Sequence, residues 1–323
     1  MDATLRPLSL GEILDRTFQL YRSHFLMFAG ISCFAAGLDL IWKLIQTTTV
    51  RAVQPRVGSV ALGGVSAGFG LVSFIVYVIV SAAAMAAISR AVSAIYLGQP
   101  TGIAQAYREV KPHWFRYVRV AAAALFMSWG PTILISVAIV GIAVAIPGFN
   151  NAIGPLITVG ILSLSFLLII PFGIWMLLRY SVCIPASLFE DLGVRASLKR
   201  SIHLSKGAMQ KLSIFVLILL VWVISAVITY AGLTPLLVSV FRTAFAHGKP
   251  VISVGMTIYT LAVQFIVASI TIPLYGIGLT LFYYDARIRK EGFDVEWLIQ
   301  RSTPEAIEPP APSLPPAESA GQA

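Results

Sequence analysis

Charged residues are scarce in this sequence. They make up 11% of its 323 residues, against roughly 25% in an ordinary soluble domain. Hydrophobic residues account for 58% of the chain, and the mean hydropathy is +0.86. A soluble protein of this length would lack the polar surface to cover so much apolar material, so a soluble fold is excluded. Lipid suits this composition as a solvent, and the sequence therefore predicts an integral membrane protein.

Cysteine is nearly absent as well. The two cysteines, Cys33 and Cys183, both lie in apolar segments, and no CxxC pair or cysteine–histidine cluster accompanies them. A disulfide framework and a zinc site of the usual spacing are therefore excluded. Both residues are expected to be small buried hydrophobic side chains. We expect no metal ion and no cofactor.

The sequence also lacks the motifs that are typical of common enzymes. None of its four histidines belongs to an HExxH motif, and the chain has no P-loop, no GxSxG motif and no GxGxxG after a strand. The glycine-rich stretch 62–70 (LGGVSAGFG) has no Lys-Ser or Lys-Thr pair, so we expect it to be a flexible entry to a membrane span. No catalytic residue is predicted, and we do not expect an enzyme.

Six long apolar segments dominate what remains. Each reaches the ~20 residues that a helix needs to cross about 30 Å of hydrocarbon. The predicted fold is therefore all-α, an integral membrane bundle of six transmembrane helices. The last segment is longer than a bilayer requires, and we expect it to tilt or to continue into the cytoplasm. The segments cover residues 25–45, 66–89, 118–146, 155–178, 212–240 and 251–284.

Positive charge is distributed unevenly around these segments. The net charge is +9, and eighteen of the 23 Lys and Arg residues lie in the two termini and in the second and fourth connections. Because positive residues stay in the cytoplasm, we expect both termini there, in a multi-pass membrane protein. The basic residues flank apolar runs, so the expected partners are anionic lipid headgroups and not nucleic acid. The predicted cytoplasmic parts are 1–24, 90–117, 179–211 and 285–323.

Three helical hairpins repeat along the chain, each after a polar amphipathic segment. The repeats run in parallel, unlike the inverted repeats of many secondary transporters. Residues 1–301 are expected to form this single domain. Residues 302–323 hold six prolines and are expected to be a disordered cytoplasmic tail. The amphipathic segments cover residues 9–22, 101–111 and 193–206.

These amphipathic segments are expected to be helices in the membrane interface. Ser9 and Glu12 form the S-x-x-E pattern of a capping box, which predicts a helix start. In the third segment we expect Gly207 to end the helix. Its basic face would carry Arg195, Lys199, His203 and Lys206, and its apolar face Val194, Leu198 and Ile202. The candidate headgroup contacts are Arg195, Lys199, Arg200 and Lys206.

A few polar residues and prolines fall inside the predicted spans. Asp39 and Lys43 are four residues apart near the outer end of the first span, which favours an ion pair along one helix. A proton or substrate role is the alternative, because ionisable groups in spans are often functional. Gln264 is expected to make an interhelical hydrogen bond. Pro171 and Pro273 are expected to kink their helices, and a binding site at broken helices is the alternative.

Near the end of the last segment, Asp285 and Arg289 are four residues apart, which predicts a helical ion pair before Gly292 ends the helix.

Three stretches are typical of a known family: LRPLSLGEILDRTFQLYRSHF, RASLKRSIHLSKG and LFYYDARIRKEGFDVEWL. Together they resemble the six-helix membrane domain of some glycerophosphoryl diester phosphodiesterases and its stand-alone prokaryotic relatives. The resemblance covers about residues 5–300.

The resemblance implies a bacterial or archaeal plasma membrane and a role near lipids or a membrane partner. It does not imply hydrolysis, because the family's activity belongs to a separate barrel domain of about 250 residues, which does not fit into this chain. We therefore expect a non-enzymatic, lipid-associated scaffold, or a partner or regulator in envelope lipid handling. The alternatives are a transporter or channel for lipids or small molecules and, third, a membrane-embedded enzyme.

Overall fold

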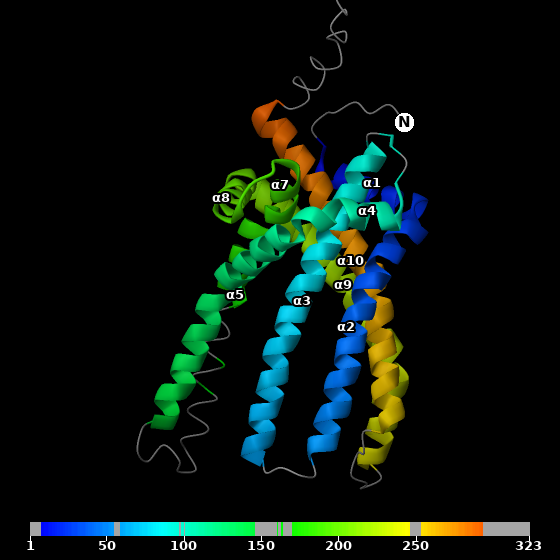
Figure 1. Cartoon of the computed structure of the whole chain (residues 1–323), viewed down its shortest axis with the longest axis vertical. Helices are drawn as coiled ribbons and strands as arrows, with labels where there is room; N and C mark the ends of the chain where they lie inside the picture. Colours follow the sequence, from blue (N-terminus) through cyan, green and yellow to red (C-terminus); the bar gives the residue numbers. More distant parts are fainter. Residues whose placement is uncertain are drawn as a thin grey trace, which may run out of the picture.

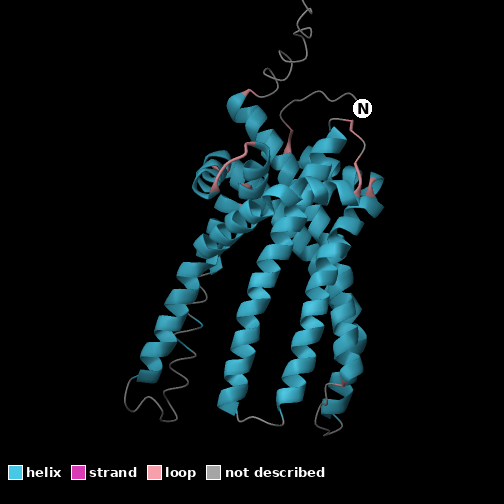
Figure 2. Ribbon diagram, in the orientation of Figure 1, coloured by secondary structure: helices cyan, strands magenta, loops and turns pink. Residues whose placement is uncertain are grey.

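The computed structural model describes residues 8–54, 59–96, 98–99, 101–145, 160, 163, 170–245 and 253–292. In these residues the regular structure is helical, without strands, and six helices are long and apolar enough to cross a membrane (Figures 1 and 2). The prediction of an all-α membrane bundle is therefore confirmed. The predicted tail, residues 302–323, lies outside the described residues.

The membrane-spanning helices alternate with short ones. The long helices are α2 (Phe25–Val53), α3 (Ser59–Tyr96), α5 (Trp114–Ala145), a helix over residues 170–180, α9 (Ala208–Phe245) and α10 (Val254–Glu291). The short helices are α1 (Leu10–Ser23), α4 (Ile103–Val110), α7 (Cys183–Phe189) and α8 (Val194–Leu204), and the 3-10 turn η2 (Lys111–His113) joins α4 to α5.

The short helices gather at one end of the bundle. Figure 1 shows α1, α4, α7 and α8 around the last turns of α10, while α2 and α9 end and α3 and α10 begin at the opposite end. We call α1, α4, α7 and α8 the collar. The amphipathic segments predicted from the sequence correspond to α1, α4 and α8. The collar is the end that the charge distribution assigns to the cytoplasm.

Helix α10 occupies the centre of the bundle and packs against α1, α2, α3, α7, α8 and α9. Two glycines allow this close packing. A Cβ atom on Gly276 would lie 2.8 Å from Cγ2 of Ile88 in α3, and one on Gly278 would lie 2.5 Å from Cδ1 of Leu217 in α9. Small residues of this kind let membrane helices approach each other closely. Beside Gly276, the hydroxyl of Thr280 donates to Ser89 at 2.9 Å.

The first and third hairpins are packed pairs, α2 with α3 and α9 with α10. In the second hairpin, α5 precedes the helix over residues 170–180, and their connection lies outside the described residues. The glycine-rich stretch 62–70 is helical and belongs to α3, so the prediction of a flexible entry is wrong. Glycine is more frequent in transmembrane helices than in soluble ones, which is consistent with a helix there.

The fourth connection holds a helix that the sequence analysis did not predict. In α7, Cys183, Ala186 and Ser187 are buried, and the helix packs against α3, α5, α8 and α10. Cys183 is thus buried as predicted, whereas Cys33 is only half-buried. The segment is apolar but short, so the sequence alone indicates the end of a span. Only its contacts with other helices, such as α8 and α10, identify it as part of the collar.

Candidate functional site

The collar is fixed to α10 by polar contacts at both of its sides. On one side, the backbone N–H of Leu8 donates to Oδ1 of Asp285 at 2.7 Å, and Arg289 donates to the Leu8 carbonyl. Arg289 also pairs with Asp285 at 2.8 Å, which confirms the predicted ion pair. The predicted capping box is present too, since Ser9 and Glu12 bond to each other's backbone N–H. The start of α1 is therefore anchored.

On the other side, α8 is held by a group of charges that we call the Arg200 clasp. Arg200 Nε lies 2.7 Å from Oε2 of Glu190, and its Nη2 donates to Oε2 of Glu291 at 2.7 Å. Hydrogen bonds to Glu291 and then to Glu190 raise the pKa of this guanidinium. Tyr283 adds a hydrogen bond to Glu190 at 2.8 Å. The clasp connects α8 to the end of α7 and to α10.

Lys290 completes this attachment by capping the end of α8. Its ammonium group donates to the carbonyls of His203, Leu204 and Lys206 at 2.6, 3.0 and 2.9 Å. Helix C-termini leave such carbonyls without partners inside the helix, so a cation there is favourable. The helix ends at Leu204, before Gly207, whose φ of +124° turns the chain into α9. The predicted end at Gly207 is therefore three residues late.

The packed face of α8 differs from the predicted apolar face. Ser197, Ser201 and Leu204 are buried, whereas Val194, Leu198 and Ile202 are only half-buried. The serines can be buried because their hydroxyls find backbone acceptors. Ser201 donates to the carbonyl of Arg179 at 2.9 Å, and Ser197 donates to that of Gly193 at 2.9 Å. The apolar side chains of Val194, Leu198 and Ile202 are thus only partly covered by the rest of the protein.

A third contact positions the loop before α8. Arg116 in α5 pairs with Asp191 at 2.7 Å, and this hydrogen bond lowers the pKa of the exposed Asp191 carboxyl. Asp191 has a φ of +56°, in the left-handed region that Asp tolerates better than most residues. The contact therefore fixes the turn from α7 into α8.

The structure separates the four candidate headgroup contacts into two groups. Arg200 is engaged in its clasp, whereas Arg195, Lys199 and Lys206 are exposed. Figure 1 shows α8 nearly end-on, while the long helices run along the bundle, so α8 lies across the direction of the spans. This is the orientation of an interfacial helix.

Further basic residues near the collar lie over aromatic rings, which the sequence analysis missed. Cζ of Arg179 and Nζ of Lys211 both lie 5.3 Å from the ring centre of Trp175. In α5, Cζ of Arg119 lies 5.0 Å from the ring centre of Phe115. Tryptophan and snorkelling cations mark the boundary of a membrane. The signal in the sequence is the four-residue spacing of each Arg from its ring.

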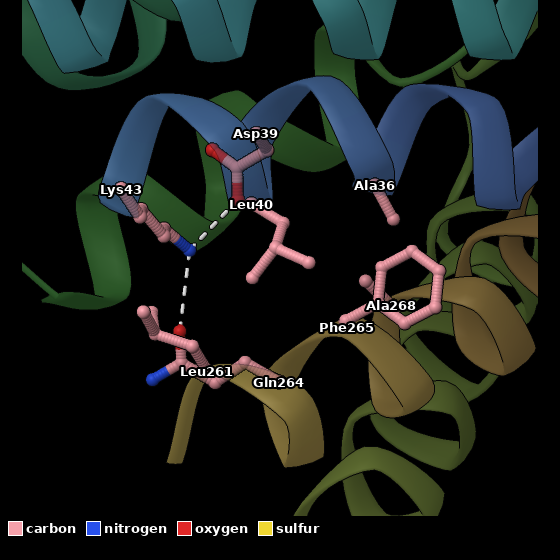
Figure 3. A pocket seen from close by; sticks show the side chains of 8 residues that line it. All are labelled: Ala36, Asp39, Leu40, Lys43, Leu261, Gln264, Phe265 and Ala268. Atoms are coloured by element: carbon pink, nitrogen blue, oxygen red, sulfur yellow. Dashed lines mark hydrogen bonds and ion pairs between the residues drawn. The ribbon is translucent and has the colours of Figure 1, made fainter. Parts of the chain in front are cut away.

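The three polar residues predicted inside spans meet at the interface of α2 and α10. Lys43 Nζ lies 2.8 Å from Oδ2 of Asp39 and 3.3 Å from Oε1 of Gln264 (Figure 3). Both the ion pair and the interhelical hydrogen bond are therefore present. The cavity beside them measures about 50 Å³, which leaves room for only a few water molecules.

Other polar contacts tie α2 to its neighbours near this cluster. Trp42 donates to Ser73 in α3 at 2.7 Å, and the Ser73 hydroxyl donates to Gln46 at 3.1 Å. Arg51 donates to Thr257 in α10. The polar residues of α2 thus join three helices, as interhelical hydrogen bonds do in membranes.

Of the two predicted kinks, Pro273 is buried inside α10, which runs continuously from Val254 to Glu291, so a broken helix is wrong there. Pro171 lies in the helix over residues 170–180. The sequence analysis did not single out Pro131 and Pro235, which lie inside α5 and α9. Among the described residues, no three His, Cys, Asp or Glu side chains are grouped to hold a metal ion.

These features define an all-α, multi-pass membrane bundle with a basic collar at one end. No family model, curated protein or solved structure matches the chain. The resemblance to the phosphodiesterase-associated membrane domain therefore remains a prediction.

Proposed function

We propose that this protein is a non-enzymatic, lipid-associated scaffold of a prokaryotic plasma membrane. It would act as a partner or regulator in the handling of envelope lipids, with its termini and collar in the cytoplasm. The observation that carries the proposal is the division of roles within α8. Arg200 fixes the helix to the bundle, and Arg195, Lys199 and Lys206 are left exposed beside it.

The fixed helix makes the exposed charges effective. Each basic residue near an anionic membrane surface contributes about 1 kcal/mol, so three contribute about 3 kcal/mol before salt screening. Because the clasp and Lys290 already hold α8 in place, lipid binding need not order it. The half-buried Leu198 and Ile202 supply apolar contact at the same depth.

A transporter is less well supported by the polar groups inside the bundle. Asp39, Lys43 and Gln264 satisfy one another beside a cavity of about 50 Å³. Small-molecule sites typically measure about 300–1,000 Å³. The cluster therefore supports packing between α2 and α10 better than passage of a solute.

The test neutralises the exposed charges and leaves the clasp intact. The triple variant Arg195→Gln, Lys199→Gln, Lys206→Gln is purified beside the wild type, and retained anionic phospholipid is counted by native mass spectrometry. Retention should fall by about tenfold or more, since screening leaves part of the ~3 kcal/mol. Hydrogen exchange over residues 194–204 and over the spans should change little, because the clasp and Lys290 still hold α8 in place.

The matched control removes three exposed basic residues elsewhere in or beside the collar, by Arg22→Gln, Arg108→Gln and Lys111→Gln. It lowers the net charge by the same amount and should retain much more anionic lipid than the α8 variant. Equal losses in both variants, or an unchanged lipid profile in the α8 variant, would show that α8 has no special role in lipid binding.

A further inference from the structure

A second cavity lies at the junction of four spans near the collar. It measures about 170 Å³ and is bounded by α3, α5, α10 and the segment from the helix over 170–180 into α7. Its apolar walls include Met85 from α3, Leu125 from α5 and Leu279 from α10. Below this junction, Figure 1 shows α5 diverging from α3 toward the opposite end of the bundle.

Hydroxyl groups line the cavity beside these apolar walls. Three tyrosines, Tyr77, Tyr180 and Tyr275, contribute to it, and their phenols make no hydrogen bond within the described part of the chain. Tyr180 and Tyr275 are half-buried, whereas Tyr77 is exposed, and tyrosine hydroxyls in partly buried positions usually have a partner. The cavity therefore offers hydrogen-bond donors that a bound molecule would satisfy.

The lining also limits the chemistry of a ligand. Among the described residues, no Asp, Glu, Lys or Arg lines the cavity, so an ionic group inside it would have no opposite charge. Its volume is below the range of about 300–1,000 Å³ for drug-sized ligands. A slender apolar chain fits such a space, provided that the rest of the molecule remains outside.

The place of the cavity along the bundle indicates where that remainder lies. Tyr180 and Ser181 line it and directly follow Arg179, which lies over Trp175 at the membrane boundary. A chain that enters the cavity would thus keep its polar end near the collar. This is the arrangement of a phospholipid from the leaflet on the collar side.

We propose that this cavity holds part of one acyl chain of a membrane phospholipid, with the tyrosine hydroxyls donating to its ester oxygens. This inference rests on the proposed lipid-associated function and adds a specific chain site to it. The headgroup contacts of α8 depend on charge, whereas the chain site depends on shape and hydroxyl groups. The two are therefore expected to respond to different substitutions.

Ala124 lines the cavity, and its neighbour Ala123 does not, so the two alanines form a matched pair. The variants Ala124→Phe and Ala123→Phe are reconstituted in vesicles that contain phosphatidylcholine with a photoreactive acyl chain. After illumination, labelled peptides are mapped by mass spectrometry. In the wild type we expect labelling over residues 77–85, 121–128 and 177–184.

Ala124→Phe should reduce this labelling by about tenfold, because the aromatic ring fills the space that the chain would occupy. Ala123→Phe should leave it unchanged. The proposal is overturned if both variants label like the wild type, or if labelling is spread evenly over exposed residues of α5 outside the cavity, such as Ile133 and Ile135.

Two further measurements make the result independent of folding and of headgroup charge. Tyr275→Phe, which keeps the ring and removes the donor, should lower labelling by an ester-linked chain more than by an ether-linked one. The α8 triple variant should keep its chain labelling in phosphatidylcholine. If chain labelling is lost in Ala124→Phe alone, the chain site is supported even if the α8 charges prove irrelevant to lipid binding. If labelling of Ala124→Phe equals that of the wild type, only the chain site is contradicted, and the proposed role of α8 is not.

Discussion

Arg195 and Arg200 lie on the same short helix, but their surroundings differ. Arg195 is exposed, and Arg200 bridges two carboxylates from other elements. The sequence analysis gave both residues the same role because it sees only local spacing. Glu291 lies 91 residues from Arg200 along the chain, so no helical pattern could predict this contact. Contacts of this kind, between residues far apart in the chain, could not be predicted from the sequence.

The Arg200 clasp predicts that substitution of Arg200 destabilises the protein more than substitution of Arg195 does. Arg200→Gln should lower the free energy of unfolding by about 2 kcal/mol, because it removes the cation that pairs with the partly buried Glu190 and one of the two cations that pair with Glu291. Arg200→Lys should recover only part of this, since an ammonium cannot fork between two carboxylates. Thermal unfolding in detergent measures the effect.

Arg195→Gln is the control on the same helix and should change stability by less than about 0.5 kcal/mol, as exposed substitutions usually do. If Arg200→Gln unfolds at the same temperature as the wild type, the clasp contributes nothing to the fold. Its charge would then be as free for lipid as that of Arg195.

At the scale of elements, helix positions follow from the sequence better than helix faces do. The capping box of Ser9 and Glu12 predicts the start of α1 because it is a local pattern. The buried face of α8 was not predicted, because a serine is buried only where its hydroxyl has a hydrogen-bond acceptor, and that acceptor cannot be identified from the sequence. For Ser201 that acceptor is the carbonyl of Arg179, on another helix. Apolar periodicity alone therefore did not identify the face of α8 that packs against the bundle.

Where α4 packs against α2, Gly30 lies close to the side chain of Ile103. A Cβ atom on Gly30 would lie 2.3 Å from Cδ1 of Ile103, and nearby the Tyr107 hydroxyl donates to the Ile31 carbonyl at 2.8 Å. We expect Gly30→Leu to displace α4 and to destabilise the protein by about 1–3 kcal/mol. Hydrogen exchange over residues 103–110 should then increase.

Gly37 is a matched control on the same helix, because nothing lies within 4 Å of a Cβ built there. Gly37→Leu should leave exchange in α4 unchanged. Adding Ile103→Ala to Gly30→Leu should restore part of the protection. If the Gly30 variant protects α4 as well as the wild type does, the close contact is not what positions this helix.

At the scale of the molecule, composition and charge predict the six spans and the grouping of the amphipathic helices. They do not predict that α10 is central. That position depends on Gly276 and Gly278, which admit Ile88 and Leu217 at short distances, and on Asp285, which binds the backbone of Leu8. The predicted continuation of the last segment is present, since α10 runs unbroken to Glu291 in the collar.

The orientation of the whole bundle is tested by labelling single cysteines in a background with Cys33→Ala and Cys183→Ala. Gln54→Cys and Ser253→Cys lie at the end opposite the collar, whereas Gln99→Cys and Lys199→Cys lie at the collar, and all four positions are exposed. Most of the Lys and Arg residues lie in the collar or in the segments beside it, and such residues stay in the cytoplasm during insertion. In intact cells, a maleimide that cannot cross membranes should therefore label only Gln54→Cys and Ser253→Cys. The other two should label after permeabilisation. Labelling of Lys199→Cys in intact cells would place the collar outside and would remove the cytoplasmic leaflet as the source of its lipid.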